Sequence, residues 1–216
     1  MRRGVLQAAA WWLAAPAILA AAAVWIGADG AGLPPLDRRG LEIAAAWRGP
    51  VLDAAFLGLT CLGSLSVLLP PVSAAAILLW RRDSPAEAGF LALALVGAAA
   101  LAHLAKELFA RARPEAVPGL SPVVSSLSFP SAHALQITAV ALAVFVLAAH
   151  RGWRRSAAAG WLLALMVALV VVMVGLSRIY LQVHYPSDVM AGMLAAVCWV
   201  LGLRAAMFAA GPARQG

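Results

Sequence analysis

The stretch 177–188 groups polar side chains between two long apolar runs. It contains Arg178, His184 and Asp188 in a chain that is 64% hydrophobic and has only four histidines. An arginine carries a planar fork of donors that matches phosphate oxygens. Asp188 could accept a hydrogen bond from one ring nitrogen of His184 and leave the other nitrogen as a nucleophile. Asp188 is also expected in the first turn of a helix, where it could serve simply as a partner of the helix dipole.

A second stretch, 106–114, carries two cations before a proline. Lys106 and Arg113 are seven residues apart, and Pro114 follows. On a continuous helix this spacing places both on one face, about 10 Å apart along the axis. Two fixed cations on one face repel each other unless an anion lies between or beside them. The alternative is a basic collar whose side chains extend to lipid headgroups.

A third stretch, 129–133, predicts the start of a helix. Pro130 suits the first helical position, and the free backbone N–H groups that follow it form an anion site together with the helix dipole. Ser131 adds a hydroxyl donor, and His133 lies within a turn of the same end. The alternative is that Ser131 only caps the helix and His133 is an interfacial residue.

Together these stretches hold three cations, a hydroxyl, a helix N-terminus and two histidines. Phosphoryl transfer needs such a set, because it requires charge neutralisation, an in-line nucleophile and an acid for the leaving oxygen. No group of Cys, His, Asp and Glu in the sequence has metal-ligand spacing, and the cations would repel a metal ion. We therefore expect chemistry without a metal or other cofactor.

The composition places these residues in a membrane protein. Only 12% of the residues are charged and the mean hydropathy is +0.91, whereas soluble domains carry about 25% charged residues. Several runs of at least 18 residues lack charge, enough to cross roughly 30 Å of hydrocarbon. The net charge of +7 is explained by arginines that orient membrane helices, so no nucleic-acid partner is expected. Cys61 and Cys198 lie in apolar runs and are interpreted as small core residues.

The sequence predicts an all-α, polytopic protein with one domain over 1–216. We expect transmembrane helices at 4–28, 54–80, 85–110, 130–149, 156–177 and 186–208, with a kink or break at Pro70–Pro71. An outer segment, 29–50, holds a possible interfacial helix at 36–47. With cytoplasmic N- and C-termini, most arginines outside the three polar stretches fall on the cytoplasmic side.

This topology brings the three polar stretches to one membrane face. The end of the third helix, the start of the fourth, the end of the fifth and the start of the sixth all lie on the outer side. The expected active-site core is 103–190. Within it His103 is interpreted as a packed helix residue, and Tyr180 and Tyr185 as members of the interfacial aromatic belt.

In order, spacing and placement at helix ends, the three stretches resemble the signature of the type 2 phosphatidic acid phosphatase (PAP2) family, which shares its core with vanadium haloperoxidases. The family pattern K-x6-R-P resembles Lys106–Pro114, P-S-G-H resembles Pro130–His133, and S-R-x5-H-x3-D resembles Ser177–Asp188. One position departs, because Ala132 stands where the pattern has glycine. Alanine keeps the backbone N–H that would face a phosphate.

The resemblance implies a role for each matching residue. His184 would attack phosphorus and form a phosphohistidine, with Asp188 orienting its ring. His133 would protonate the leaving oxygen and later activate water. The phosphate would be held by Lys106, Arg113, Ser131, Arg178 and the N–H of Ala132.

The implied activity is that of a lipid phosphatase in a bacterial plasma (inner) membrane, with its site facing the periplasm or exterior. Candidate substrates are undecaprenyl diphosphate, phosphatidylglycerol phosphate and phosphatidic acid. One alternative is a phosphotransferase that uses the same histidines on a lipid acceptor. Another is an anion-binding transporter, which is disfavoured because the first, second, fifth and sixth spans carry no ionisable residue deep in the membrane.

Overall fold

The protein is represented by a computed structural model that describes residues 2–27, 32–114, 125–152 and 157–208. These residues form eight α-helices and no β-strand, and an isolated antiparallel bridge joins Ala112 to Leu127. The helices are α1 (Arg2–Gly27), α2 (Pro35–Ala46), α3 (Pro50–Cys61), α4 (Leu65–Arg81), α5 (Pro85–Phe109), α6 (Ala132–His150), α7 (Ala157–Tyr180) and α8 (Pro186–Phe208). The predicted all-α class is confirmed.

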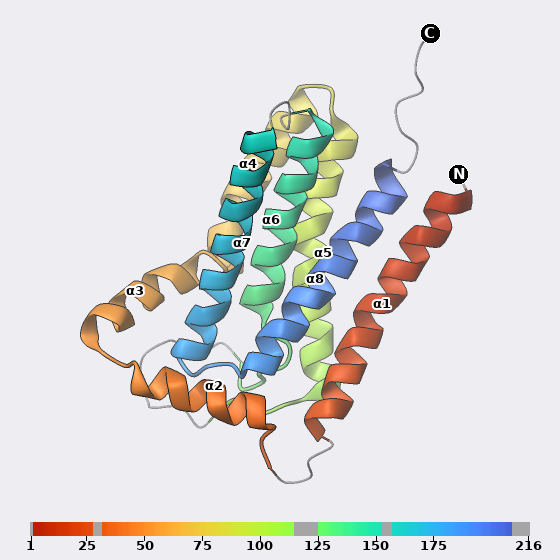
Figure 1. Cartoon of the computed structure of the whole chain (residues 1–216). Helices are drawn as coiled ribbons and strands as arrows, with labels where there is room; N and C mark the ends of the chain where they lie inside the picture. The colour runs from red at the N-terminus through yellow and green to blue at the C-terminus, as the bar shows by residue number, and fades with distance from the viewer. Residues whose placement is uncertain (1, 28–31, 115–124, 153–156, 209–216) are drawn as a thin grey trace.

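Five helices are long and apolar enough to cross a membrane, namely α1, α5, α6, α7 and α8. A sixth candidate span exists if α3 and α4 count as one crossing bent by 42°. The first residues of α1 and the last residues of α8 lie at the same end of the bundle, and α2 lies across the opposite end (Figure 1). The polytopic helical architecture is thus confirmed, while the side of the membrane that each end faces stays a prediction.

The centre of the bundle is formed by α5, α6 and α8, which pack on one another. On the buried side of α5, Ala94, Ala98, Ala102 and Ala105 follow one another every three or four residues. Small side chains at this spacing let neighbouring helices approach closely, which is how helices associate where lipid removes the hydrophobic driving force. Helix α1 lies along α8 at the edge of the bundle.

The predicted helix 54–80 is in fact two helices, and the break is not at the prolines. Pro70 and Pro71 lie inside α4, whereas the chain turns at 62–64. Ser64 caps α4, since its hydroxyl oxygen accepts from the amide of Val67 at 3.3 Å. Gly63 meets α6 and α7 so closely that a Cβ would lie 2.7 Å from Cγ1 of Val174. Close packing and a cap therefore decide where this span bends.

Two helix ends near the polar stretches also differ from the prediction. Helix α5 ends at Phe109, because Ala110 adopts a left-handed conformation with φ of 46°. Arg113 is therefore outside the helix, and the expected single helical face with Lys106 is wrong. Helix α6 begins at Ala132 rather than Pro130, with Ser131 as its N-cap.

The remaining sequence interpretations have mixed outcomes. A helix at 36–47 is confirmed by α2, which starts and ends one residue earlier. His103 is exposed on α5 instead of packed, and Cys61 is exposed while Cys198 is buried as expected. Tyr180 and Tyr185 are buried in protein contacts rather than turned to lipid.

Candidate active site

The three predicted polar stretches meet at the end of the bundle where α2 lies. The guanidinium of Arg113 is 3.2 Å from Nε2 of His184, which links the segment after α5 to the loop between α7 and α8. The amide of Ser131 donates to the carbonyl of Asp188 at 3.0 Å, which links the start of α6 to the start of α8. His133 has the ionisable side chains of Arg178, His184, Arg113 and Lys106 as neighbours. The convergence predicted from topology is therefore observed.

His184 is 1% exposed and its ring is held from both sides. Its Nδ1 faces Oδ2 of Asp188 at 3.4 Å, and its Nε2 faces Nη1 of Arg113 at 3.2 Å. A guanidinium only donates, so Nε2 must be the acceptor and the ring proton belongs on Nδ1, facing the carboxylate. The pKa of His184 lies well below its usual value, first because of burial and then because of the charges of Arg178, Arg113 and Lys106. The ring is thus a neutral imidazole with a lone pair on Nε2.

Asp188 is fully buried and is held more tightly by other groups than by His184. Its Oδ1 accepts from Nη1 of Arg111 at 2.6 Å, and its Oδ2 accepts from the amide of Tyr185 at 3.0 Å. Both distances are shorter than the 3.4 Å to the ring of His184. Asp188 is therefore an anchored carboxylate, positioned by Arg111 and by the first turn of α8, against which the histidine ring rests.

Arg178 reaches the site from the last turn of α7 and is 3% exposed. Its Nη1 donates to the hydroxyl of Thr60 on α3 at 2.5 Å. Its Nε is one of two buried side-chain polar atoms without a hydrogen-bond partner in the part of the chain that the structure describes. An unsatisfied buried N–H is costly, so this donor is suited to an anion that enters the site.

Lys106 and Arg113 are held by backbone carbonyls of residues 125–128, which precede α6. Nζ of Lys106 donates to the carbonyls of Leu127 and Ser128 at 2.7 and 3.1 Å. Nε of Arg113 donates to the carbonyl of Ser125 at 2.7 Å. Burial lowers the pKa of Arg113, and the Asp188 carboxylate opposes that shift. The two cations thus reach the same site from different segments rather than from one helical face.

The start of α6 presents a helix N-terminus to this cluster. The hydroxyl oxygen of Ser131 accepts from the amide of Ala134 at 3.4 Å, so Ser131 caps α6. A hydroxyl that accepts can also donate its proton, so the phosphate-binding role of Ser131 stays a prediction. The amides of Ala132 and His133 are in the first turn, where helix geometry leaves them without a carbonyl partner inside the helix. Gly63 allows the close approach of the α3–α4 corner, since a Cβ there would lie 3.0 Å from Cβ of His133.

Sequence reasoning missed two residues that support the site, Arg111 and Asp37. The guanidinium of Arg111 donates to Asp188 and also to Oδ2 of Asp37 at 2.7 Å, and it lies 3.9 Å over the ring of Tyr185. Asp37, in the first turn of α2, further accepts from the amide and hydroxyl of Ser187 at 2.9 and 2.6 Å. The one available signal was a third cation, Arg111, between the two that the motif names. Nothing in the sequence around Asp37 indicates a buried partner.

The composition of this cluster differs from that of a metal site. Over the described ranges, no three His, Cys, Asp or Glu side chains lie together as the ligands of a metal ion would. The polar groups that converge are mainly cations and histidines. Their arrangement can bind an oxyanion such as phosphate, because donors from a helix N-terminus and from arginines lie around one imidazole nitrogen, Nε2 of His184.

Comparison with known proteins agrees with this arrangement. The model of the PAP2 superfamily matches residues 87–212, which is more than half of the chain. The chain belongs to the PAP2 superfamily. Phosphatidylglycerophosphatase B of Bacillus subtilis (strain 168) is 30% identical over 155 residues, which cover 70% of this chain and 73% of that protein.

A further relative of this PAP2 protein is also a phosphatase, and two crystal structures share its fold. Decaprenylphosphoryl-5-phosphoribose phosphatase of Mycobacterium tuberculosis is 45% identical over 96 residues, which cover 44% of this chain and 46% of that protein. The crystal structure of a transmembrane PAP2 type phosphatidylglycerolphosphate phosphatase from Bacillus subtilis superposes with a TM-score of 0.72 over 97% of this chain and 99% of that chain, at 24% identity. Aquifex aeolicus LpxE superposes with a TM-score of 0.60 at 25% identity, over 79% and 96% of the two chains.

These relationships make the protein a membrane phosphatase of the PAP2 superfamily. The matched range, 87–212, includes every residue of the predicted catalytic and phosphate-binding set. Helices α1 to α4 precede it. The residues that carry the family's motifs are therefore separate in sequence from α2 and α3, which cover the same end of the bundle.

Proposed function

We propose that this PAP2 protein hydrolyses the phosphate or diphosphate group of a membrane lipid through a phosphohistidine on His184. The observation that carries the proposal is the placement of a neutral His184 ring between Asp188 at Nδ1 and Arg113 at Nε2. In that tautomer the lone pair lies on Nε2, which is the nitrogen on the side of the cations. Both curated relatives named above are phosphatases of lipid phosphates, which further supports a lipid substrate.

In the first step Nε2 of His184 attacks phosphorus, and the bond from phosphorus to the lipid oxygen breaks. His133 donates a proton to that oxygen, so the lipid leaves as an alcohol, or as a monophosphate if the substrate is a diphosphate. The phosphorylated ring carries a positive charge, which the carboxylate of Asp188 stabilises through the Nδ1 proton. Arg178, with its partnerless Nε, and Arg113 bind the phosphate oxygens as charge develops on them.

In the second step water attacks the phosphohistidine. His133, now neutral, takes a proton from that water as the nitrogen–phosphorus bond breaks. Inorganic phosphate leaves, and His184 returns to its neutral form with the proton on Nδ1. Atoms and charges balance in both steps.

We infer further that this site faces the outside of the plasma membrane. The support is the distribution of arginines, since Arg81 ends α4, Arg82 follows it and Arg151 follows α6, at the helix ends that point away from the site (Figure 1). Positive residues at helix ends favour the cytoplasmic side.

A Ser125→Cys variant in a Cys61→Ala background should react with a membrane-impermeant maleimide in intact cells, while Ser84→Cys should not. Labelling of Ser84→Cys but not of Ser125→Cys would instead show that the site faces the cytoplasm.

The deciding experiment is release of inorganic phosphate by the purified protein from phosphatidylglycerol phosphate, undecaprenyl diphosphate and phosphatidic acid in detergent micelles. We expect His184→Ala to remove activity on every substrate, a loss of roughly 10⁴-fold or more. His103→Ala is the matched control, because His103 is an exposed histidine outside the polar cluster. Undiminished turnover by His184→Ala would refute the mechanism. Transfer of the phosphoryl group to a lipid without phosphate release would indicate a phosphotransferase instead.

A further inference from the structure

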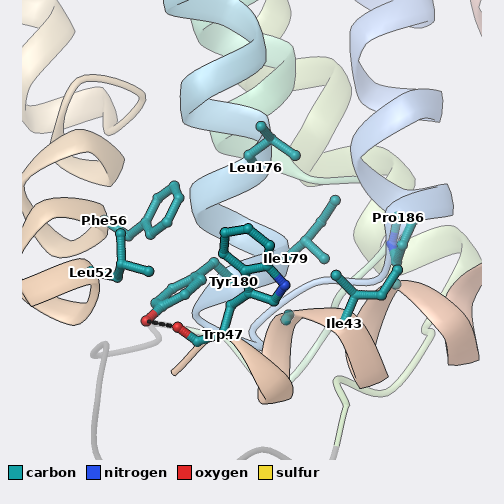
Figure 2. Close-up of a pocket in the computed structure, with 10 residues that line it drawn as sticks. Ile43, Trp47, Leu52, Phe56, Leu176, Ile179, Tyr180 and Pro186 are labelled. Carbon is teal, nitrogen blue, oxygen red and sulfur yellow. Dashed lines mark hydrogen bonds between the residues drawn. The ribbon is translucent and has the colours of Figure 1, made fainter. Parts of the chain in front are cut away.

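An apolar cavity of about 410 Å³ lies in the corner between α2, α3 and the last turns of α7. Figure 2 shows its walls, with Ile43 from α2 and Trp47 just after it, Leu52 and Phe56 from α3, and Leu176 and Ile179 from α7. The cavity exists because α3 leaves the line of α4 at the 42° bend and packs on α7 rather than on the central helices. Its volume falls in the range of sites that bind small molecules.

The polar groups beside the cavity are occupied by one another. The hydroxyl of Tyr180 donates to Oδ1 of Asp53 at 2.6 Å, and Nε of Arg48 donates to the same oxygen at 3.0 Å. The ring of Tyr180 stacks on Phe56 with centroids 4.2 Å apart. The walls therefore offer aliphatic and aromatic surface, and an occupant with hydroxyl groups would lose its hydrogen bonds to water without gaining others.

The cavity adjoins the segments that carry the proposed phosphate-binding cations, and one face of α3 leads from the cavity toward them. Leu52 and Phe56 line the cavity, and Thr60, one turn further along, accepts the hydrogen bond from Arg178. One turn of helix is about 5.4 Å. From the other side, Pro186 contributes to the wall only two residues after His184. A molecule whose phosphate is at Arg178 can thus extend along this face of α3 toward the cavity.

We propose that this cavity binds the segment of the substrate's hydrocarbon chain that lies next to the phosphate. This inference rests on the proposed function, and it names the part of the lipid that the protein recognises by shape. The walls contributed by α2 and α3 precede residue 87, so they lie outside the range that matches the family model. Part of the wall that selects the chain is then contributed by residues outside the family's motifs.

The first test uses the wild-type protein and a ladder of alkyl phosphates of increasing chain length. Burial of each methylene contributes about 0.8 kcal/mol, which corresponds to roughly a fourfold rise in kcat/KM per carbon. We expect kcat/KM to rise with chain length and then level off once the cavity is filled. A kcat/KM that does not change with chain length would overturn the proposal. Absence of phosphate release from every alkyl phosphate in the series would instead contradict the proposed function.

The second test fills the cavity from two walls, with the variants Leu52→Trp and Ile43→Trp. We expect kcat/KM for a long-chain lipid phosphate to fall by about tenfold or more, while hydrolysis of p-nitrophenyl phosphate, which has no chain, changes less than twofold. Leu165→Trp, on an exposed site of α7 remote from the cavity, is the matched control. Equal losses on both substrates, or no loss on the lipid, would overturn the proposal.

A third readout does not depend on turnover. A lipid phosphate with a photoreactive diazirine on the carbons next to the phosphate should crosslink within residues 43–56, as read by mass spectrometry of the digested protein. Excess unlabelled lipid should compete with that labelling. Specific labelling of another surface, such as the lipid-facing side of α1, would overturn the assignment even if phosphatase activity is normal.

Discussion

The backbone amide of Ser131 donates to the carbonyl of Asp188 at 3.0 Å. This bond joins the residue that caps α6 to the first turn of α8, so the two helices that carry His133 and Asp188 begin at a shared point. The contact is possible because Gly192 lies one turn further along α8, where it leaves room for the Ser131 backbone. A Cβ at Gly192 would lie 2.9 Å from the carbonyl oxygen of Ser131. The relative position of the two halves of the site therefore depends on one glycine.

Gly192→Ala should separate the starts of α6 and α8 and reduce both stability and activity. Overpacking against backbone costs about 1–3 kcal/mol, and a shift of a few tenths of an ångström at His133 reduces proton transfer. We expect a lower Tm in detergent and about a tenfold or larger fall in kcat. Gly89→Ala is the control, because a Cβ there would meet only the end of Met207 at 3.7 Å. Equal behaviour of the two variants would contradict this account.

Asp37→Asn should weaken the anchoring of Asp188 through Arg111. The substitution keeps the size of the side chain but removes the charge that Arg111 faces on α2. Breaking one partner of a buried ion pair costs about 3–5 kcal/mol, and we expect kcat to fall more than KM changes. Glu42→Gln on the same helix is the control, because its pairing with Arg39 is exposed and surface pairs contribute little. Steady-state kinetics with thermal melts would separate the two variants.

Arg178→Lys should lose phosphate binding although it retains a positive charge. An ammonium cannot both bond Thr60 and offer the fork geometry that matches a phosphate. Removing one such donor costs roughly 10²–10³-fold in rate, and we expect the inhibition constant of orthovanadate to rise as well. Arg204→Lys, exposed at the other end of α8, should match the wild type in both measurements. Unchanged vanadate inhibition in Arg178→Lys would exclude Arg178 from the phosphate site.

The pH dependence should reflect the depressed pKa of His184. Because the nucleophile must be neutral, protonation of His184 removes activity, and a lowered pKa moves this acid limb of kcat/KM below the usual histidine value of about 6.5. Arg113→Gln removes one cation, so the pKa should rise and the acid limb should move to higher pH, whatever the loss in absolute rate. An acid limb that moves to lower pH in this variant would contradict the electrostatic argument.

The same depressed pKa affects stability. Below about pH 6.5 the unfolded chain protonates this histidine while the folded protein does not, so the unfolded state binds more protons and stability falls as pH decreases. Above that pH the group is neutral in both states and contributes no pH dependence. Thermal melts across this range in wild type and His184→Gln should therefore converge at neutral pH and diverge in acid.

Removal of metal ions should leave the reaction intact. We propose that Arg113, Arg178 and Lys106 neutralise the charge of the phosphate, so that no divalent cation is needed to complete the site. We expect activity after dialysis against EDTA to remain within twofold of the untreated protein. A reproducible loss that Mg²⁺ restores would show that the described cations are insufficient.

Residue type and spacing were enough to predict which polar stretches meet, because each stretch is local and apolar runs of fixed length set which helix ends share a membrane face. The sequence did not reveal how the cations approach one another. Helix α5 ends four residues before Arg113 through a left-handed Ala110, although no glycine or proline marks that point. The contacts of Arg111 and Arg113 with distant segments compensate for this conformation, and such contacts leave no local pattern.

The support from α2 was unpredictable for the same reason. Asp37 is 74 residues from Arg111 and 150 residues from Ser187 along the chain, so only the folded arrangement relates them. The bend at 62–64 likewise depends on Gly63 fitting against Val174 and His133. Pro70–Pro71 was the stronger local signal, yet a helix in a packed bundle accommodates these prolines within α4.

The bend between α3 and α4 also has a consequence for how such a protein can change over time. Because α4 stays in the bundle while α3 turns outward, mutations in residues 50–61 can accumulate without disturbing the packing of α5, α6 and α8. Thr60 is the exception in this segment, because it accepts from Arg178. Descendants of one ancestral phosphatase could therefore come to act on different lipids while the groups around His184 stay the same. For protein engineers, this corner offers a recombination boundary at which a donor segment that retains Thr60 can be grafted onto the central helices.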